Sequence, residues 1–209
     1  MAVTFRRTTT SAAREVRERP QTPTPPFPYR ADDVTFTNPV AAGVTLAGTL
    51  TLPQGSGPFP AAILLSASGA QDRDETMFGH KPFAVIADHL TRRGIAVLRY
   101  DDRGVGRSTG DFPAATSADF ATDARAAVRY LLTRPEIDRG GIGFIGHSEG
   151  GMVAQIAAVN NEHLQFMIML AGPGTDLMQL VQSQERLLAV SQGASDEDLA
   201  RMAPIMREV

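Results

Sequence analysis

The sequence contains no cysteine in its 209 residues. This absence excludes a disulfide framework, a cysteine nucleophile and a thiolate-bound metal. The sequence also has no large excess of charge, because 20 lysines and arginines nearly balance 23 aspartates and glutamates, which gives a net charge of −3. A strongly basic surface would be needed to hold a phosphate backbone or an anionic bilayer. We therefore expect neither nucleic acid nor a membrane as a partner.

Long hydrophobic runs are missing as well. No apolar run approaches the roughly 20 residues that a membrane-spanning helix needs. Residues 1–19 carry several arginines but lack the apolar stretch of a secretory signal. On this basis we favour a cytoplasmic location.

The positions of prolines and apolar residues predict three parts. A chain of 209 residues is long enough for one domain with a full core. Residues 1–28 are expected to form a tail with a proline-rich spacer, residues 29–174 the core domain, and residues 175–209 a helical segment. The amphipathic patterns at 176–190 and 196–209 are typical either of a cap over a substrate pocket or of ordinary surface helices.

The pattern within the core domain predicts an α/β fold. Residues 34–38 and 44–52 alternate between apolar and polar side chains, which is typical of an antiparallel hairpin. Four continuous apolar runs have the character of buried parallel strands, and helical patterns separate them. The runs are 61–65, 95–100, 142–145 and 166–170, and helices are expected at 83–90, after a cap at Ser117, and after residue 148. This alternation predicts a mostly parallel sheet with helices on both faces.

The clearest chemical signal is the segment Gly146-His147-Ser148-Glu149-Gly150. It stands between an apolar strand pattern and a helix pattern of small apolar residues, which is the context of a G-x-S-x-G nucleophile elbow. The glycines allow a tight turn with the serine at positive φ, and the turn presents the serine oxygen at a helix N-terminus. A serine that only caps a helix is the alternative interpretation.

Two further loops follow predicted parallel strands. Residues 66–75 read SASGAQDRDE, and residues 101–108 read DDRGVGRS. Together with the elbow, these loops resemble the α/β-hydrolase superfamily. More narrowly, they resemble the bacterial serine esterases of the dienelactone-hydrolase-like and prolyl-oligopeptidase-like branch. The resemblance extends over about residues 27–174 and implies the α/β-hydrolase fold.

The resemblance also implies a reaction. Ser148 would attack the carbonyl of a small ester substrate and carry the acyl group. The oxyanion would be held by the backbone N–H of Glu149 and by one from the first loop, at Ser68, with Ala67 or Gly69 as neighbouring alternatives. No metal or organic cofactor is implied. The charged run 72–75, like Asp102 and Arg103, is expected to hold loops in shape rather than to react.

A serine nucleophile needs a base, and the family order is serine, then acid, then histidine. The only histidine after Ser148 is His163, which lies between the elbow helix and the next strand, at the opposite edge of the sheet. We therefore expect the acid and the histidine on a C-terminal remainder of the same hydrolase, which would be a partner of this chain. A triad of Ser148 with His80 and Asp176 is the alternative within the chain.

Other interpretations stay open at this point. A serine peptidase of the prolyl-oligopeptidase type would use the same nucleophile. A non-catalytic module that binds acyl ligands or a partner protein would need no base. An open sheet edge would also allow copies of the chain to pair, so a homo-oligomer is a further expected assembly. His147 occupies a variable position of the elbow and is expected to point away from the nucleophile.

Overall fold

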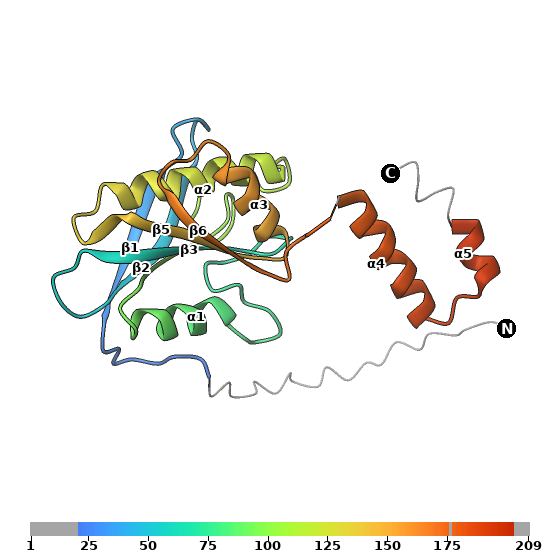
Figure 1. Cartoon of the computed structure of the whole chain (residues 1–209), viewed down its shortest axis with the longest axis horizontal. Helices are drawn as coiled ribbons and strands as arrows, with labels where there is room; N and C mark the ends of the chain where they lie inside the picture. The colour runs from blue at the N-terminus through green and yellow to red at the C-terminus, as the bar shows by residue number, and fades with distance from the viewer. Residues whose placement is uncertain (1–20, 176, 203–209) are drawn as a thin grey trace, which may run out of the picture.

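The computed structural model describes residues 21–175 and 177–202 (Figure 1). Most of the predicted tail lies outside the described residues, as does Asp176. The core is a six-stranded sheet with α1 (Pro82–Thr91) on one face. The other face carries α2 (Ser117–Leu132) and α3 (Glu149–Ala158). This architecture confirms the predicted α/β fold with helices on both faces.

The sheet is mostly parallel, as predicted. Its strands are β1 (Arg30–Thr37), β2 (Thr45–Leu52), β3 (Phe59–Leu65), β4 (Ala96–Tyr100), β5 (Ile137–His147) and β6 (Leu164–Leu170). They lie in the order β1-β2-β4-β3-β5-β6. The predicted hairpin is present as the antiparallel pair of β1 and β2, and β2 runs antiparallel to β4. The remaining pairs, from β4 through β3 and β5 to β6, are all parallel.

Four strands begin earlier than the sequence predicted. β1 begins at Arg30, β3 at Phe59, β5 at Ile137 and β6 at Leu164. The polar and glycine residues 138–141 interrupt the apolar pattern and hide the start of β5. Phe59 pairs with Ile137 before a shift in register, and this pairing extends both strands.

The start of α2 corrects one prediction. Thr116, and not Ser117, is the N-cap residue. The reason is a capping box: the Thr116 hydroxyl accepts from the Asp119 N–H at 3.4 Å, and the Asp119 carboxylate accepts from the Thr116 N–H at 2.9 Å. The Ser117 hydroxyl instead donates to the Glu149 carboxylate at 2.6 Å. This contact joins the start of α2 to the start of α3.

Buried apolar side chains fix the central strands between the helical layers. On the face of α2 and α3, Phe144 of β5 packs in the same buried cluster as Leu131. On the face of α1, Phe83 packs with Leu64 and Val97. Complete burial of a side chain of this size contributes about 1.5–3 kcal/mol. β5, which leads into the elbow, is therefore held from both sides.

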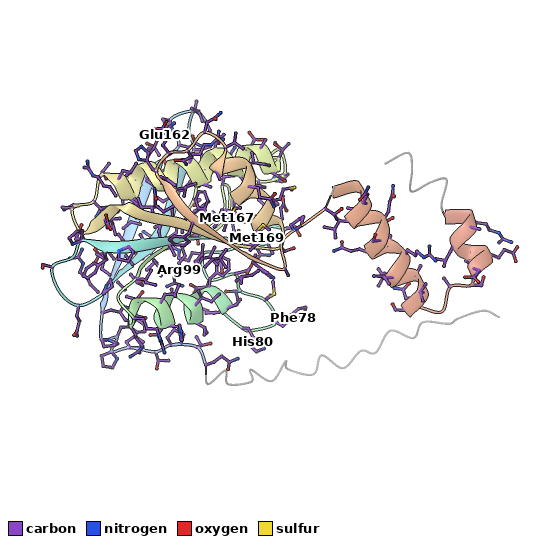
Figure 2. All side chains as sticks on the ribbon, in the orientation of Figure 1. Phe78, His80, Arg99, Glu162, Met167 and Met169 are labelled. Atoms are coloured by element: carbon purple, nitrogen blue, oxygen red, sulfur yellow. The ribbon has the colours of Figure 1, made fainter. Side chains whose placement is uncertain are left out.

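The last strand, β6, is different. It pairs with β5 only, among the described residues, and its apolar side chains from Phe166 to Leu170 are 36–46% exposed. Met167 and Met169 of this strand are labelled in Figure 2. In the described part of the chain, β6 is thus an apolar edge strand, the kind of surface that pairs readily with another strand.

The C-terminal segment contains α4 (Leu177–Ser191) and α5 (Asp196–Met202). The second helix was predicted to extend to residue 209, and residues 203–209 lie outside the described part. In Figure 1 both helices stand to one side of the sheet, and their role as a cap stays a prediction. None of the helices within residues 21–175 and 177–202 combines the length and apolar character of a membrane-spanning helix.

Candidate active site

The carboxyl edge of the parallel sheet brings together four loops. They follow β3, β4, β5 and β6, because parallel strands end at the same edge. In open α/β sheets, ligands bind at this edge. Among the described residues, five non-glycine residues have positive φ, and four of them belong to these loops: Glu75, Phe78, Ser148 and Ala171. Backbone strain is thus concentrated at this edge.

Ser148 connects β5 to α3 in a strained turn. Its φ of 51° and ψ of −117° lie in a region that L-residues rarely adopt. The Ser148 N–H donates to the Leu170 carbonyl at 2.9 Å, which ties the turn to the end of β6. A methyl group on Gly146 would overlap the Gly150 carbonyl oxygen, and one on Gly150 would overlap the Leu65 carbonyl oxygen. The positive φ expected of the serine is confirmed, and both glycines are sterically required.

Two backbone N–H groups lie in the segments where oxyanion donors were predicted. Glu149 is the first residue of α3, so its N–H has no partner within the helix. In the loop after β3, the Ala67 N–H donates to the Glu75 carboxylate at 2.7 Å and is therefore occupied. No hydrogen bond joins the Ser68 N–H to any described residue. Of the three candidates in this loop, Ser68 and Gly69 have N–H groups that no described residue accepts from.

The buried side chain of Asp102 also binds the loop after β3. Its carboxylate accepts from the Ser66 hydroxyl at 2.8 Å and from the Gln71 N–H at 3.0 Å. The pKa of Asp102 is raised to about 7, mainly by burial and also by the nearby carboxylates Asp123 and Glu149, against the lowering effect of both hydrogen bonds. Asp102 therefore shapes the loop, as the sequence predicted, and titrates near neutrality.

The pKa of Asp102 predicts a dependence of stability on pH. The folded state holds this proton up to about pH 7, whereas the unfolded state releases it near 3.8. The unfolding free energy should therefore fall as pH rises from 4 to 7, by on the order of 3 kcal/mol from this group. Urea unfolding at pH 5 and pH 7.5 should show a smaller fall in Asp102→Asn than in the wild type. An equal fall in both proteins would contradict the assignment.

The other charged residues of these loops form ion pairs, which supports their predicted structural role. Arg73 donates to Asp101 through Nε at 3.0 Å and Nη2 at 2.8 Å. Arg103 donates to Asp123 through Nε at 2.7 Å and Nη2 at 2.9 Å. Asp74 forms ion pairs with Arg99 and Lys81. The charged run therefore fastens its loop to the sheet and to the loop after β4.

No histidine hydrogen-bonds to Ser148 among the described residues. His147 hydrogen-bonds through Nδ1 to Glu75 at 2.8 Å. Nδ1 of His80 contacts Nε2 of Gln21 at 3.1 Å. His163 is exposed beside the start of β6, at the opposite edge of the sheet. The alternative triad therefore lacks a hydrogen bond between His80 and Ser148, and its acid, Asp176, lies outside the described residues.

A cavity of about 760 Å³ opens next to the elbow. Its wall is mainly apolar and includes Met77, Phe78, Phe83, Val85, Ile86 and Leu170. Figure 2 shows Phe78 and His80 on the loop that leads into α1. His147, which precedes Ser148, also lines this cavity. Sequence reasoning missed it because its wall combines one face of α1, a loop and the end of β6, which no single motif reveals.

A metal site has no support in the described part of the chain. Within residues 21–175 and 177–202, no three histidine, aspartate or glutamate side chains form a group that could hold a metal ion.

The sheet order, the strained serine turn and the glycines around it define an α/β hydrolase. Comparison with known proteins agrees, since a family model described as X-Pro dipeptidyl-peptidase (S15 family) matches residues 42–207. The chain therefore belongs to the S15 family. This membership bears out the resemblance to serine hydrolases of the α/β fold.

Two curated relatives and two solved structures illustrate the relationship. Esterase EstD of Thermotoga maritima is 34% identical over 143 residues, which are 68% of this chain and 34% of the esterase. Acyl-coenzyme A thioesterase 1 of Homo sapiens is 31% identical over 115 residues, which are 54% of this chain and 23% of the thioesterase. The chain thus spans about a third or less of the length of these relatives.

The solved structures share the fold at low sequence identity. The hypothetical protein PA2218 from Pseudomonas aeruginosa superposes with a TM-score of 0.61 at 21% identity, covering 90% of this chain and 61% of that one. The Pyrococcus furiosus esterase Pf2001 superposes with a TM-score of 0.60 at 21% identity, covering 85% of this chain and 64% of that one.

Proposed function

We propose that this chain carries the nucleophile of a serine hydrolase that cleaves small carboxylic esters through an acyl-enzyme on Ser148. The observation that carries the proposal is the strained turn at Ser148, with φ of 51°, between β5 and α3. A strained non-glycine residue at the ligand-binding edge of a sheet persists when the position has a function. The names of two similar proteins, an esterase of T. maritima and an esterase of P. furiosus, add support.

The proposed reaction has two halves. Ser148 Oγ attacks the ester carbonyl carbon while its proton passes to a histidine, and the carbonyl oxygen becomes an oxyanion. The N–H groups of Glu149 and Ser68 stabilise that oxyanion, and its collapse expels the alcohol, which takes the proton from the histidine. Water then attacks the acyl-enzyme by the same route and releases the acid.

We place the histidine and the acid of the triad on polypeptide outside these 209 residues. This placement is supported by the contacts of the histidines, since none of them hydrogen-bonds to Ser148 among the described residues. Under this proposal His80→Gln should lower the rate of Ser148 acylation by less than tenfold. A loss of more than a thousandfold would favour the triad of Ser148, His80 and Asp176 instead.

A serine peptidase is the second candidate. The family model that matches the chain is described as X-Pro dipeptidyl-peptidase. Serine enzymes cleave peptides and esters alike through an acyl-enzyme. Parallel assays with p-nitrophenyl acetate and with an X-Pro p-nitroanilide separate the two. We expect turnover of the ester and little or none of the anilide.

Covalent labelling tests the nucleophile itself. The full-length protein is treated with a fluorophosphonate and digested with trypsin, and the adduct is located by mass spectrometry. We expect a single adduct on the peptide between Arg139 and Arg186, at Ser148, and an intact mass that shows whether the protein extends beyond 22.4 kDa. An adduct elsewhere, or none, would overturn the proposal and favour a module that only binds ligands.

A further inference from the structure

We propose that Glu75 is a positioning residue that holds the two oxyanion-donor segments at a fixed separation. One segment is the loop after β3, which contains Ala67 and Ser68, and the other is the elbow from His147 to Glu149. The inference rests on the proposed serine hydrolysis and adds a residue to it, since Glu75 would never touch the substrate's reacting atoms.

A single carboxylate oxygen of Glu75 makes both contacts. Oε1 accepts from the Ala67 N–H at 2.7 Å and contacts His147 Nδ1 at 2.8 Å. Ala67 directly precedes Ser68, and His147 directly precedes Ser148. The atom that fixes one donor segment therefore also fixes the other, across two strands of the sheet.

Glu75 is unusually buried for a glutamate. It is 1% exposed and is among the largest fully buried side chains of the described residues. A buried carboxylate is costly unless its hydrogen-bonding capacity is used. Glu75 also has a φ of 51°, a strained conformation for a residue other than glycine. Burial and strain together indicate that the surroundings hold this side chain in one place.

A tight polar turn sets the direction of Glu75. The Glu75 N–H donates to the Asp72 carbonyl at 2.9 Å. The Asp72 side chain accepts from the N–H groups of Asp74 and Thr76, at 2.9 and 3.0 Å. Asp74 on the same turn is held by Arg99 and Lys81. The hydrogen bonds of Asp72 thus close the turn and set the direction of Glu75, whereas the ion pairs of Asp74 are separate contacts that stabilise the same turn.

The consequence for catalysis is geometric. Because the Ala67 N–H is occupied, the next N–H along the loop, that of Ser68, is left to meet the oxyanion with that of Glu149. Hydrogen bonds are stronger in a buried, low-dielectric site than in water, so the bridge can set the spacing of the two segments. A misplacement of about 1 Å at a reacting centre can lower a rate by about a hundredfold.

The contact with Glu75 also fixes the orientation of the His147 ring. With Nδ1 bound to the carboxylate, Nε2 lies on the other side of the ring. His147 lines the apolar cavity next to Ser148. The ring is therefore held as part of the wall and is kept from turning toward the nucleophile.

Three variants of the full-length protein test the proposal. Glu75→Ala removes the bridge, and Glu75→Gln keeps one oxygen that can accept both hydrogen bonds. Asp74→Asn is the matched control, because it breaks an ion pair on the same turn without touching either donor segment. Each variant is assayed for ester turnover, thermal stability, and inhibition by a trifluoromethyl ketone, which adds to the serine and places an oxyanion between the donors.

For Glu75→Ala we expect kcat to fall by about 30–100-fold with KM changed by less than threefold, and inhibition by the trifluoromethyl ketone to weaken in parallel. Glu75→Gln should recover most of this loss but keep a three- to tenfold deficit, because a neutral amide oxygen accepts hydrogen bonds more weakly than a carboxylate. Asp74→Asn should lose stability and keep kcat within threefold. If the fluorophosphonate does not label Ser148 in the parent protein, the proposed function itself is refuted.

With an active parent protein, three results would overturn the role of Glu75. The first is a kcat within twofold of the parent in Glu75→Ala. The second is a drop in kcat of equal size in Asp74→Asn. The third is a loss of kcat without weaker inhibition by the ketone. If Glu75→Ala does not fold, Glu75→Gln decides: a kcat reduced three- to tenfold with matching loss of inhibition supports the role, and an unchanged kcat refutes it.

Discussion

Replacement of Ser148 by alanine is expected to lower ester turnover by at least ten-thousand-fold. Removing the nucleophile of a serine hydrolase leaves only binding and oxyanion stabilisation, and losses in kcat of about a millionfold are typical. Hydrolysis of p-nitrophenyl acetate by the full-length protein measures the effect. Turnover above about 1% of the parent rate would show that another group attacks the ester.

Ser148→Gly is the informative companion to Ser148→Ala. Both variants lose the nucleophile, but only glycine adopts φ of 51° and ψ of −117° without strain. We expect Ser148→Gly to unfold with a free energy about 1 kcal/mol higher than Ser148→Ala, because relief of strain outweighs the entropy that glycine loses on folding. Equal stability of the two variants in urea unfolding would mean that the turn holds no strain.

Replacement of Asp123 by asparagine is expected to cost about 3–5 kcal/mol of unfolding free energy, which is typical of a buried ion pair that loses one partner. Asp123 and Arg103 are both nearly inaccessible to solvent. Among the described residues, the hydrogen-bond partners of the Asp123 carboxylate are all donors, namely Nε and Nη2 of Arg103 and Nδ2 of Asn38. An asparagine amide group would turn one of these contacts into a clash of two donors.

Two controls accompany the Asp123 variant. Glu197→Gln breaks an exposed pair with Arg201 on α5 and should leave stability unchanged within error. The double variant Arg103→Met/Asp123→Leu removes both charges and should lose less stability than Asp123→Asn, because no unpaired charge remains buried. A loss below about 1 kcal/mol for Asp123→Asn would show that Arg103 finds another partner.

The parallel strands were predictable because each contains a continuous apolar run. The ends of the elements were harder. The polar residues 138–141 concealed the first half of β5, and the capping box placed the start of α2 one residue before Ser117. In both cases a specific contact outweighs the local pattern. For β5 this contact is pairing with a strand distant in sequence, and for α2 it is a hydrogen bond to a residue three positions along the chain.

The candidate site was predictable only where one motif contains it. The elbow motif of five consecutive residues predicted Ser148 as the nucleophile and Glu149 as an oxyanion donor. Glu75 was interpreted as one member of a charged run, since no local pattern reveals that its carboxylate meets Ala67 and His147, which lie 8 and 72 residues away. The apolar cavity was hidden for the same reason, because segments that are distant in sequence form it.

The strain at the carboxyl edge has a consequence for attempts to make this protein withstand heat. Four residues there, Glu75, Phe78, Ser148 and Ala171, adopt conformations that glycine would occupy more comfortably. Substitutions that relax this edge would raise the melting temperature and disturb the positions on which the proposed chemistry depends. A search for thermostable variants should therefore begin far from this edge, in the β1–β2 hairpin and the outer face of α2, where gains in robustness leave the elbow untouched.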